Sequence, residues 1–418
     1  MTRRLLILIL LGGLLWALNA SQGHARTDAP WTLEQLPPAI GLDAWHQAGY
    51  RGEGVRIGIL DIGFAGVEAL TDHIVIADPA AVAAEDHNSY SHGTKITQIT
   101  HYLAPDAEFY LFTLNLKGDN LWVGIDWLLT HQVDVALMAG ARLDVPLDGD
   151  NYTTQQIDRL AAHGILVVVP AGNHGRSYLT GTFQDTDGDG WHEFSGGYGS
   201  WGVVPLYSSQ FGLAHLRWED AWQAAAIDLD LYVMAANAQR VMAASTDVQN
   251  GTMRAMPYED AYFPTVAGQP YYIAVRAKDS HTAQGTPFHL YVDDAVLSDV
   301  PVPGSIVAPG DSRYAITVGG HEHDGRLYDR SGIGPTWDGR IKPDLLAPAR
   351  IELPSGQFFG TSASVPVVAG AVAILRQAMP GASPDDIKRF LFDHALDFGE
   401  PGRDNLSGYG VIHLPLPE

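Results

Sequence analysis

Short apolar runs alternate with helix-length amphipathic segments in two separated parts of this chain, and this alternation limits the possible folds more than any other feature. Val55–Leu60, Val133–Ala139 and Ile165–Pro170 are apolar runs of strand length. Between them, apolar residues recur at helical spacing, as in segment 96–103. Buried strands separated by helices are typical of parallel sheets that are covered on both faces. The sequence therefore predicts an α/β fold with a doubly wound, mostly parallel sheet.

The pattern changes between residues 176 and 302, where short segments rich in Tyr, Val and Thr follow one another without a clear helix. In Phe288–Val292, for example, apolar residues occupy alternate positions, as a half-buried strand requires, and Leu229–Met234 is a similar run. We expect residues 176–302 to form an all-β sandwich domain. It would be inserted in a discontinuous α/β domain made of residues 26–175 and 303–418.

Two helices are predicted near the end of the chain. A deeply buried helix should begin near Ser362 and end at about Met379, with Pro366 in its first turn, where a missing N–H is tolerated. The last helix has Ser383 as its N-cap and Pro384 at its first position.

Charge and cysteine content exclude several classes of function. The chain has 25 Lys and Arg against 48 Asp and Glu, a net charge of −23. Binding to nucleic acid or to an anionic membrane needs clustered positive charge, so we expect neither as a partner. Because there is no cysteine, the protein has neither disulfides nor thiolate metal sites.

The N-terminus has the features of a secretory signal peptide. Arg3 and Arg4 precede the apolar run Leu5–Leu18, and small residues follow up to Ala25. The alternative is an uncleaved anchor, but the run is shorter than the ~20 residues that span a bilayer. We expect residues 1–25 to be removed, leaving a secreted or periplasmic protein without stable membrane association.

Two candidate catalytic residues follow regular elements of the α/β pattern. Asp61 comes directly after the first apolar strand, and active-site groups of open α/β sheets lie at the carboxyl ends of strands. An Asp there is also a common turn former. His92 lies where helical periodicity begins, although a histidine at a helix start is often a surface or capping residue.

Two further candidates suit an acyl-transfer site. The hydroxyl of Ser362 is expected at a helix N-terminus, where the dipole and a free amide stabilise a developing oxyanion. A plain N-cap serine is the alternative. Asn173 follows a strand, so its amide is a possible oxyanion donor, or else it is a loop Asn beside Gly172.

The order of these motifs gives the resemblance to a known family. The segments ILDIG, SHGT, PAGNHG and GTSASVP resemble the four signature segments of the subtilisin-like serine peptidases, and SGIGPTWDGRIKPDLLAP resembles the segment that precedes the serine motif. The chain order Asp, His, Ser is that of subtilisin, and no G-x-S-x-G surrounds Ser362.

The resemblance implies Ser362 as nucleophile and His92 as general base and then acid. It implies that Asp61 orients the imidazolium and that Asn173 is the side-chain oxyanion donor, with the Ser362 amide as the second donor. The expected activity is hydrolysis of peptide bonds by a monomeric endopeptidase through an acyl-enzyme.

Two departures from the family pattern stand out. Ile62 replaces the usual Ser or Thr after the aspartate, which removes one hydrogen bond to that carboxylate. The segment VALMAGARL replaces one that usually lines the substrate cleft, so Leu137, Ala139 and Ala141 are expected to alter side-chain preference.

An acidic run inside the predicted sandwich suggests a structural calcium site. Asp185, Asp187 and Asp189 alternate before a glycine, so that their oxygens can converge on Ca²⁺, with Glu193 or the Trp191 carbonyl as further ligands. The final Glu of an EF-hand loop is missing, and the alternative is a solvated acidic turn. The segment also resembles β-sandwich modules of secreted bacterial peptidases, through WEDAW followed by DLDLYV.

Two other functions stay open on the sequence alone. One is a catalytically silent binding protein that keeps the fold and uses the sandwich for recognition, an alternative motivated by Ile62 and the altered cleft segment. The other is a lipase or esterase, which the missing G-x-S-x-G motif disfavours.

Overall fold

The computed structural model describes residues 29–84, 92–115, 119–194, 199–205, 211–235, 240–266 and 268–417. The predicted signal peptide lies outside these residues. The chain divides into two compact units. The larger unit takes in Asp28–Asn173 and Pro303–Glu418, and the smaller one takes in His174–Val302. Each unit has its own hydrophobic core.

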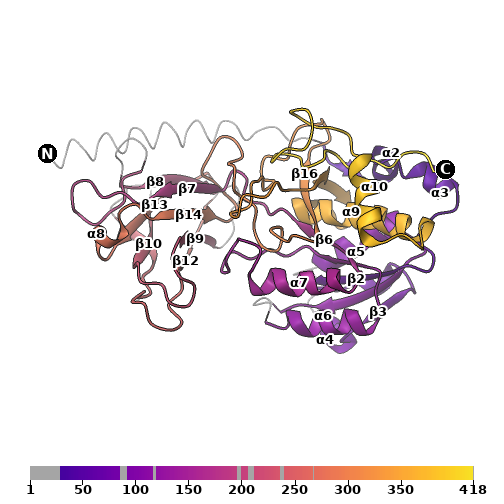
Figure 1. Ribbon diagram of the computed structural model, residues 1–418, viewed down its shortest axis with the longest axis horizontal. Helices are drawn as coiled ribbons and strands as arrows, with labels where there is room; N and C mark the ends of the chain where they lie inside the picture. Colours follow the sequence, from indigo (N-terminus) through magenta and orange to yellow (C-terminus); the bar gives the residue numbers. More distant parts are fainter. Residues whose placement is uncertain are drawn as a thin grey trace. The chain divides into compact units, whose positions relative to one another are not determined.

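A parallel sheet of seven strands forms the centre of the larger unit (Figure 1). Its strands are β2 (Arg56–Asp61), β3 (Ile74–Ile76), β4 (Glu108–Thr113), β5 (Val135–Met138), β6 (Leu166–Pro170), β16 (Ile316–His321) and β17 (Leu345–Pro348). They are ordered β17-β16-β6-β5-β2-β4-β3, and every neighbouring pair is parallel. The chain winds from β2 in both directions, so the carboxyl end of β2 lies at the crevice where such sheets bind ligands.

Helices cover both faces of this sheet. The main ones are α5 (His92–Leu103), α6 (Leu121–Thr130), α7 (Tyr152–Ala162), α9 (Thr361–Ala378) and α10 (Pro384–Asp393). Helices α5 and α9 pack together on one face, and α6 and α7 pack together on the other. The alternation along β2 explains this, because Ile57 and Ile59 join the core beneath α5 and α9 whereas Leu60 joins the opposite core. The predicted doubly wound α/β fold is confirmed.

Helix α9 is the buried helix that the sequence predicted. Among the described helices it alone is long and apolar enough to cross a membrane, but 83% of that stretch is buried, as in the core helix of a globular unit. The expected position of Pro366 was wrong. Because the helix starts at Thr361, Pro366 lies inside it and cannot donate to the Ser362 carbonyl one turn earlier.

The smaller unit consists of two antiparallel sheets around one core. Its strands are β7 (Tyr178–Thr182), β8 (Trp201–Pro205), β9 (Gly212–Trp218), β10 (Leu229–Met234), β11 (Val241–Ser245), β12 (Tyr258–Phe263), β13 (Tyr271–Ala277), β14 (Pro287–Val292) and β15 (Ala295–Val296). The sheets have the orders β11-β10-β13-β8-β15 and β12-β9-β14-β7. Alternate residues of facing strands, such as Leu231 and Leu290, fill the space between them. This is the all-β sandwich that the alternating pattern predicted.

A small three-stranded sheet in the larger unit was not predicted. It consists of β1 (Trp31–Thr32), β18 (Arg350–Leu353) and β19 (Gly356–Phe359), in which β18 and β19 form a hairpin. The hairpin leads directly into α9. The remaining short helices are η1 (Leu33–Gln35), α2 (Leu36–Ala39), α3 (Asp43–Gln47), η2 (Val67–Ala69), α4 (Pro79–Ala83) and α8 (Ser280–Ala283).

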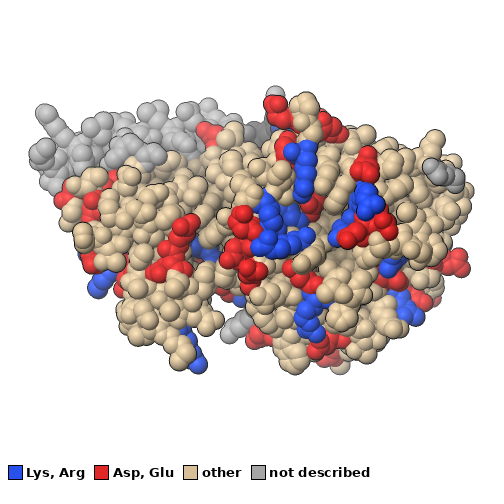
Figure 2. Space-filling model, viewed as in Figure 1, with Lys and Arg blue, Asp and Glu red and all other residues tan. Residues whose placement is uncertain are grey.

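On the face of the molecule drawn in Figure 2, the larger groups of Lys and Arg lie beside acidic side chains. The ion pairs of the larger unit include Arg313 with Asp338 and Lys388 with Asp385. Positive charge on this face is therefore largely compensated locally.

Candidate active site

Asp61 and His92 form a short hydrogen bond at the carboxyl edge of the parallel sheet. Asp61 is the last residue of β2, and His92 is the first residue of α5. His92 Nδ1 lies 2.6 Å from Asp61 Oδ1. The Asp61 side chain is 1% exposed and that of His92 is 21% exposed, so the imidazole joins a buried carboxylate to the surface. The two ring nitrogens of a histidine are chemically distinct, and this bond engages Nδ1 of His92.

The other oxygen of Asp61 has no hydrogen-bond partner among the described residues, although it is buried. The Ile62 N–H donates to Asp61 Oδ1 at 2.7 Å, the same oxygen that meets His92. In the family pattern a Ser or Thr at this position offers a hydroxyl donor, which the Ile62 side chain does not have. Among the described residues, the hydrogen bonds to this carboxylate therefore all meet Oδ1.

Ser362 is the second residue of α9 and is 8% exposed. Its hydroxyl donates to the Ala139 carbonyl at 3.1 Å. At this position the backbone amide has no acceptor within the helix, and it lies at the positive end of the helix dipole. The serine therefore combines a hydroxyl with an amide suited to a developing negative charge.

Asn173 lies beyond the end of β6, with its side chain against the start of α9. Its Oδ1 accepts hydrogen bonds from Thr361 N at 2.8 Å and from Thr361 Oγ1 at 3.1 Å. Both bonds occupy the amide oxygen, so the side-chain orientation is fixed and Nδ2 is left as a donor. Gly360 makes this contact possible, because a Cβ there would lie 2.8 Å from Asn173 Nδ2.

All four predicted catalytic residues lie in the larger unit, at or beyond strand ends or at helix starts. The predictions for the cleft segment were partly wrong. Leu137 is 1% exposed and belongs to the hydrophobic core, so it does not face a substrate. Ala139 contributes its carbonyl to Ser362, and Ala141 is exposed.

Phe358 is a neighbour of the site that the sequence analysis missed. It lies on β19, and the centroid of its ring is 5.1 Å from that of His92 in an edge-to-face arrangement. In the sequence it is simply an apolar residue shortly before Gly360. Only the hairpin of β18 and β19 brings it to the imidazole.

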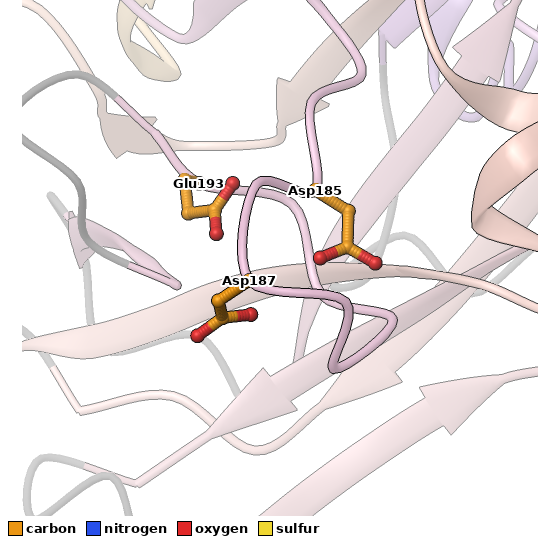
Figure 3. Close-up of side chains that lie close together, drawn as sticks. All are labelled: Asp185, Asp187 and Glu193. Atoms are coloured by element: carbon orange, nitrogen blue, oxygen red, sulfur yellow. The ribbon is translucent and has the colours of Figure 1, made fainter.

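The smaller unit has an acidic cluster on the loop between β7 and β8. The carboxylates of Asp185, Asp187 and Glu193 offer oxygens that all lie within 4.8 Å of one another. Figure 3 shows Asp185 and Asp187 on one turn of the chain and Glu193 on the segment beside it. Asp189 is not a member of this group, and its carboxylate accepts from Trp191 N at 2.9 Å.

Backbone N–H groups hold the loop in shape. Asp185 accepts from Gly188 N at 2.7 Å and from Gly190 N at 2.9 Å, and Glu193 accepts from Thr186 N at 2.8 Å. A hydrogen bond from Ser280, helped by these backbone donors, lowers the pKa of Asp185, so the carboxylate is ionised at neutral pH.

Comparison with known proteins links the chain to one family. The model of the subtilase family matches residues 288–410, which include Ser362. Subtilisin DY of Bacillus licheniformis is 31% identical over 156 residues, which are 34% of this chain and 55% of that protein. Subtilisin E of Bacillus subtilis is 26% identical over 174 residues, 37% of this chain and 42% of that protein. The chain thus spans about half the length of these relatives.

The similarity of fold extends further than that of sequence. The structure of the Clostridium perfringens CspB protease matches with a TM-score of 0.62 over 89% of this chain and 95% of that one, at 18% identity. At this identity the match concerns the fold alone.

Proposed function

We propose, from the premise that this chain belongs to the subtilase family, that it is a serine endopeptidase with Asp61, His92 and Ser362 as its catalytic residues. The observation that carries the proposal is the 2.6 Å hydrogen bond between a buried carboxylate and an imidazole at the carboxyl edge of the sheet. A structural histidine needs no buried anion, whereas a general base that becomes positively charged is stabilised by one.

In the proposed reaction, the Ser362 hydroxyl leaves the Ala139 carbonyl and donates its proton to His92 Nε2. Ser362 Oγ attacks the substrate carbonyl at the same time. His92 then protonates the leaving amine, and water hydrolyses the acyl-enzyme with His92 again acting as base. Asp61 holds the imidazole in the tautomer that this requires and stabilises its positive charge.

Two donors would stabilise the tetrahedral oxyanion. One is Asn173 Nδ2, which is oriented because Thr361 occupies the amide oxygen. The other is the Ser362 amide in the first turn of α9. Removing one such donor in a serine peptidase costs about 3–4 kcal/mol of transition-state stabilisation.

Labelling with a fluorophosphonate probe tests the nucleophile. We expect the purified protein to be labelled and the Ser362→Ala variant to be unlabelled, with mass spectrometry placing the adduct on Ser362. Ser364 provides a matched control, since its hydroxyl is also buried in α9 but donates to the carbonyls of Ala347 and Pro348. The Ser364→Ala variant should still be labelled.

The second candidate is a silent binding protein, favoured by Asp61 Oδ2, which finds no hydrogen-bond partner in the part of the chain that the structure describes. Absence of labelling in folded protein, together with no cleavage of casein, would support this candidate over the peptidase. Cleavage of a short ester without cleavage of casein would point to an esterase instead.

We also propose that the acidic cluster of the smaller unit binds a structural Ca²⁺. The donor set fits this ion, because three carboxylates converge and Ca²⁺ prefers oxygen ligands. Asp185, Asp187 and Glu193 would hold it. A bound ion would offset the repulsion among these carboxylates and so stabilise the folded loop.

Calcium binding is tested on the melting temperature. Ca²⁺ at about 100 times its Kd should stabilise the protein by about 2.7 kcal/mol, and EDTA should reverse this. Asp187→Asn should remove most of the effect. Asp189→Asn is the matched comparison, since Asp189 lies outside the cluster. If this variant lost the calcium effect on the melting temperature equally, Asp189 would also be a ligand. An unchanged melting temperature in EDTA would contradict a structural calcium ion.

Peptide or protein substrates, a monomeric state and a secreted or periplasmic location complete the proposal. The location depends on residues 1–25, so N-terminal sequencing of protein from a secreting host should begin at Arg26. Retention of Met1 in a membrane fraction would contradict it.

A further inference from the structure

Phe358 occupies a fixed position beside the proposed general base. It lies on β19 and pairs with Ile351 of β18, and it is 7% exposed within the core of the larger unit. Its ring meets the His92 imidazole edge to face, with centroids 5.1 Å apart and an interplanar angle of 78°. Such aromatic pairs are attractive beyond the surface area that they bury.

The hydrogen bond to Asp61 does not by itself fix the plane of the imidazole. It holds Nδ1 at 2.6 Å from Asp61 Oδ1, and rotation about that bond would tilt the ring while keeping this distance. His92 is also the partly exposed member of the pair, at 21%. Phe358 contacts the ring itself, and such a contact opposes tilting and so bears on the direction of Nε2.

Lys95 meets the same aromatic ring. It lies on α5 three residues after His92, so the two side chains project from one side of the helix. Lys95 Nζ is 5.7 Å from the Phe358 centroid, within the range of a cation–π contact. The phenyl ring of Phe358 thus contacts the side chains of both His92 and Lys95 on α5.

The same hairpin also leads to the nucleophile. Phe358 is followed by Phe359, Gly360 and Thr361, and Ser362 comes next. The Gly360 amide donates to the Ala349 carbonyl at 2.8 Å, which fixes the end of the hairpin. A shift of β19 would therefore move the support of His92 and the start of α9 together.

We propose that Phe358 is a positioning residue for catalysis, which holds the His92 imidazole at the angle needed to accept the Ser362 proton, and that Lys95 secures the phenyl ring. This inference rests on the proposed peptidase function. Phe358 touches no reacting atom in this account and acts only through His92.

Steady-state kinetics on a short peptide substrate tests the inference with Phe358→Leu and Phe358→Tyr. Loss of the aromatic contact should lower kcat about 2- to 12-fold with KM unchanged. The Tyr variant keeps the ring and should stay within about twofold of the wild type. Phe390→Leu is the control, since this phenyl group packs against the same core but lies on α10, and the kcat of this variant should not change.

Three outcomes would overturn the inference. They are an unchanged kcat in Phe358→Leu, a changed KM with unchanged kcat, and an equal loss of kcat in Phe390→Leu. The second would make Phe358 a substrate contact, and the third would mean a general effect of core destabilisation.

A double-mutant cycle separates the role of Lys95. If Lys95 acts through the ring, Lys95→Met should lower kcat in the wild type but have no further effect in Phe358→Leu. Additive effects would exclude Lys95 from the arrangement. In Lys95→Met the methionine keeps the apolar stem of lysine, so only the charge is lost.

Nuclear magnetic resonance gives a readout that does not need activity. The Nδ1 proton of His92 should give a sharp resonance in the wild type and a broadened one in Phe358→Leu, because the ring is then free to tilt. If the wild type neither turns over substrate nor reacts with a fluorophosphonate, the peptidase proposal fails, whereas an unchanged His92 resonance in Phe358→Leu refutes the positioning role on its own.

Discussion

Replacing Gly360 by Ala should displace the oxyanion donor Asn173 while leaving Asp61, His92 and Ser362 unchanged in sequence. Gly360 has φ 94° and ψ 178°, a backbone conformation that is essentially restricted to glycine. A Cβ at this position would lie 2.8 Å from both Asn173 Nδ2 and Asn173 Oδ1. The methyl group and the Asn173 amide cannot occupy these positions together, so one of them must move.

Two contributions set the size of the effect. Backbone strain should reduce the free energy of unfolding by about 1–3 kcal/mol. Displacement of Asn173 should cost at most the value of one oxyanion donor, about 3–4 kcal/mol, which corresponds to a fall in kcat of about 10²- to 10³-fold. Because the displacement is a partial loss, we expect kcat to fall about 10²-fold, with a small change in KM.

The assay compares Gly360→Ala with Gly356→Ala by steady-state kinetics and thermal unfolding. Gly356 has φ 102° and is the first residue of β19, the strand that ends just before Gly360, but a Cβ there would meet nothing within 4 Å. Both variants should lose stability, and only Gly360→Ala should lose kcat. In an Asn173→Ala background, Gly360→Ala should have little further effect on kcat. A wild-type kcat in Gly360→Ala, or an equal loss in Gly356→Ala, would refute the reasoning.

Three further predictions concern stability. Burial opposes protonation of His215, but the carboxylates of Asp260 and Asp293 raise its pKa to about 9. The charged His215 therefore stabilises the folded protein. This contribution is complete below the pKa of the histidine in the unfolded chain and is lost as pH rises through 9. The melting temperatures of the wild type and His215→Gln should converge between pH 7 and 10. Burial raises the pKa of Glu259 to about 7, so ionisation of this buried carboxyl destabilises the folded protein above that pH. Glu259→Gln should therefore raise the melting temperature at pH 8 but not at pH 5. A gain at both pH values would contradict this. Asp311 is fully buried and accepts three hydrogen bonds near the start of α7, so Asp311→Ala should cost about 3 kcal/mol in denaturant unfolding, and a loss below about 1 kcal/mol would contradict the burial argument.

The elements that form regular local patterns were predictable from the sequence. The strand Leu229–Met234 has the predicted bounds, because strict alternation marks both its ends. Helix α10 begins after Ser383 as predicted, since a capping serine and a following proline specify a helix start from local geometry. The candidate residues Asp61, His92, Asn173 and Ser362 were likewise predicted, because each lies in a motif next to such an element.

Boundaries between elements were less predictable. The apolar run Tyr314–Val318 in the sequence overlaps β16, but the strand itself runs from Ile316 to His321. Gly319 and Gly320, near the end of the strand, have no side chain that could form a pattern, and they belong to the strand because they pair with β17. Pairing with a neighbouring strand is a property of the tertiary structure, and the local sequence does not record it.

Contacts between distant segments required the fold. The position of Phe358 against His92 depends on a hairpin whose strands are too short to show a period, and on its attachment to the start of α9. The acidic cluster shows the same limit. The sequence suggested Asp185, Asp187 and Asp189 as ligands, with Glu193 as a possible addition, and only the fold of the loop shows that the carboxylates of Asp185, Asp187 and Glu193 converge without that of Asp189. Sequence patterns determined which side chains emerge at strand ends and helix starts, whereas their mutual orientation came from packing, because the direction of a side chain depends on the segments that surround it.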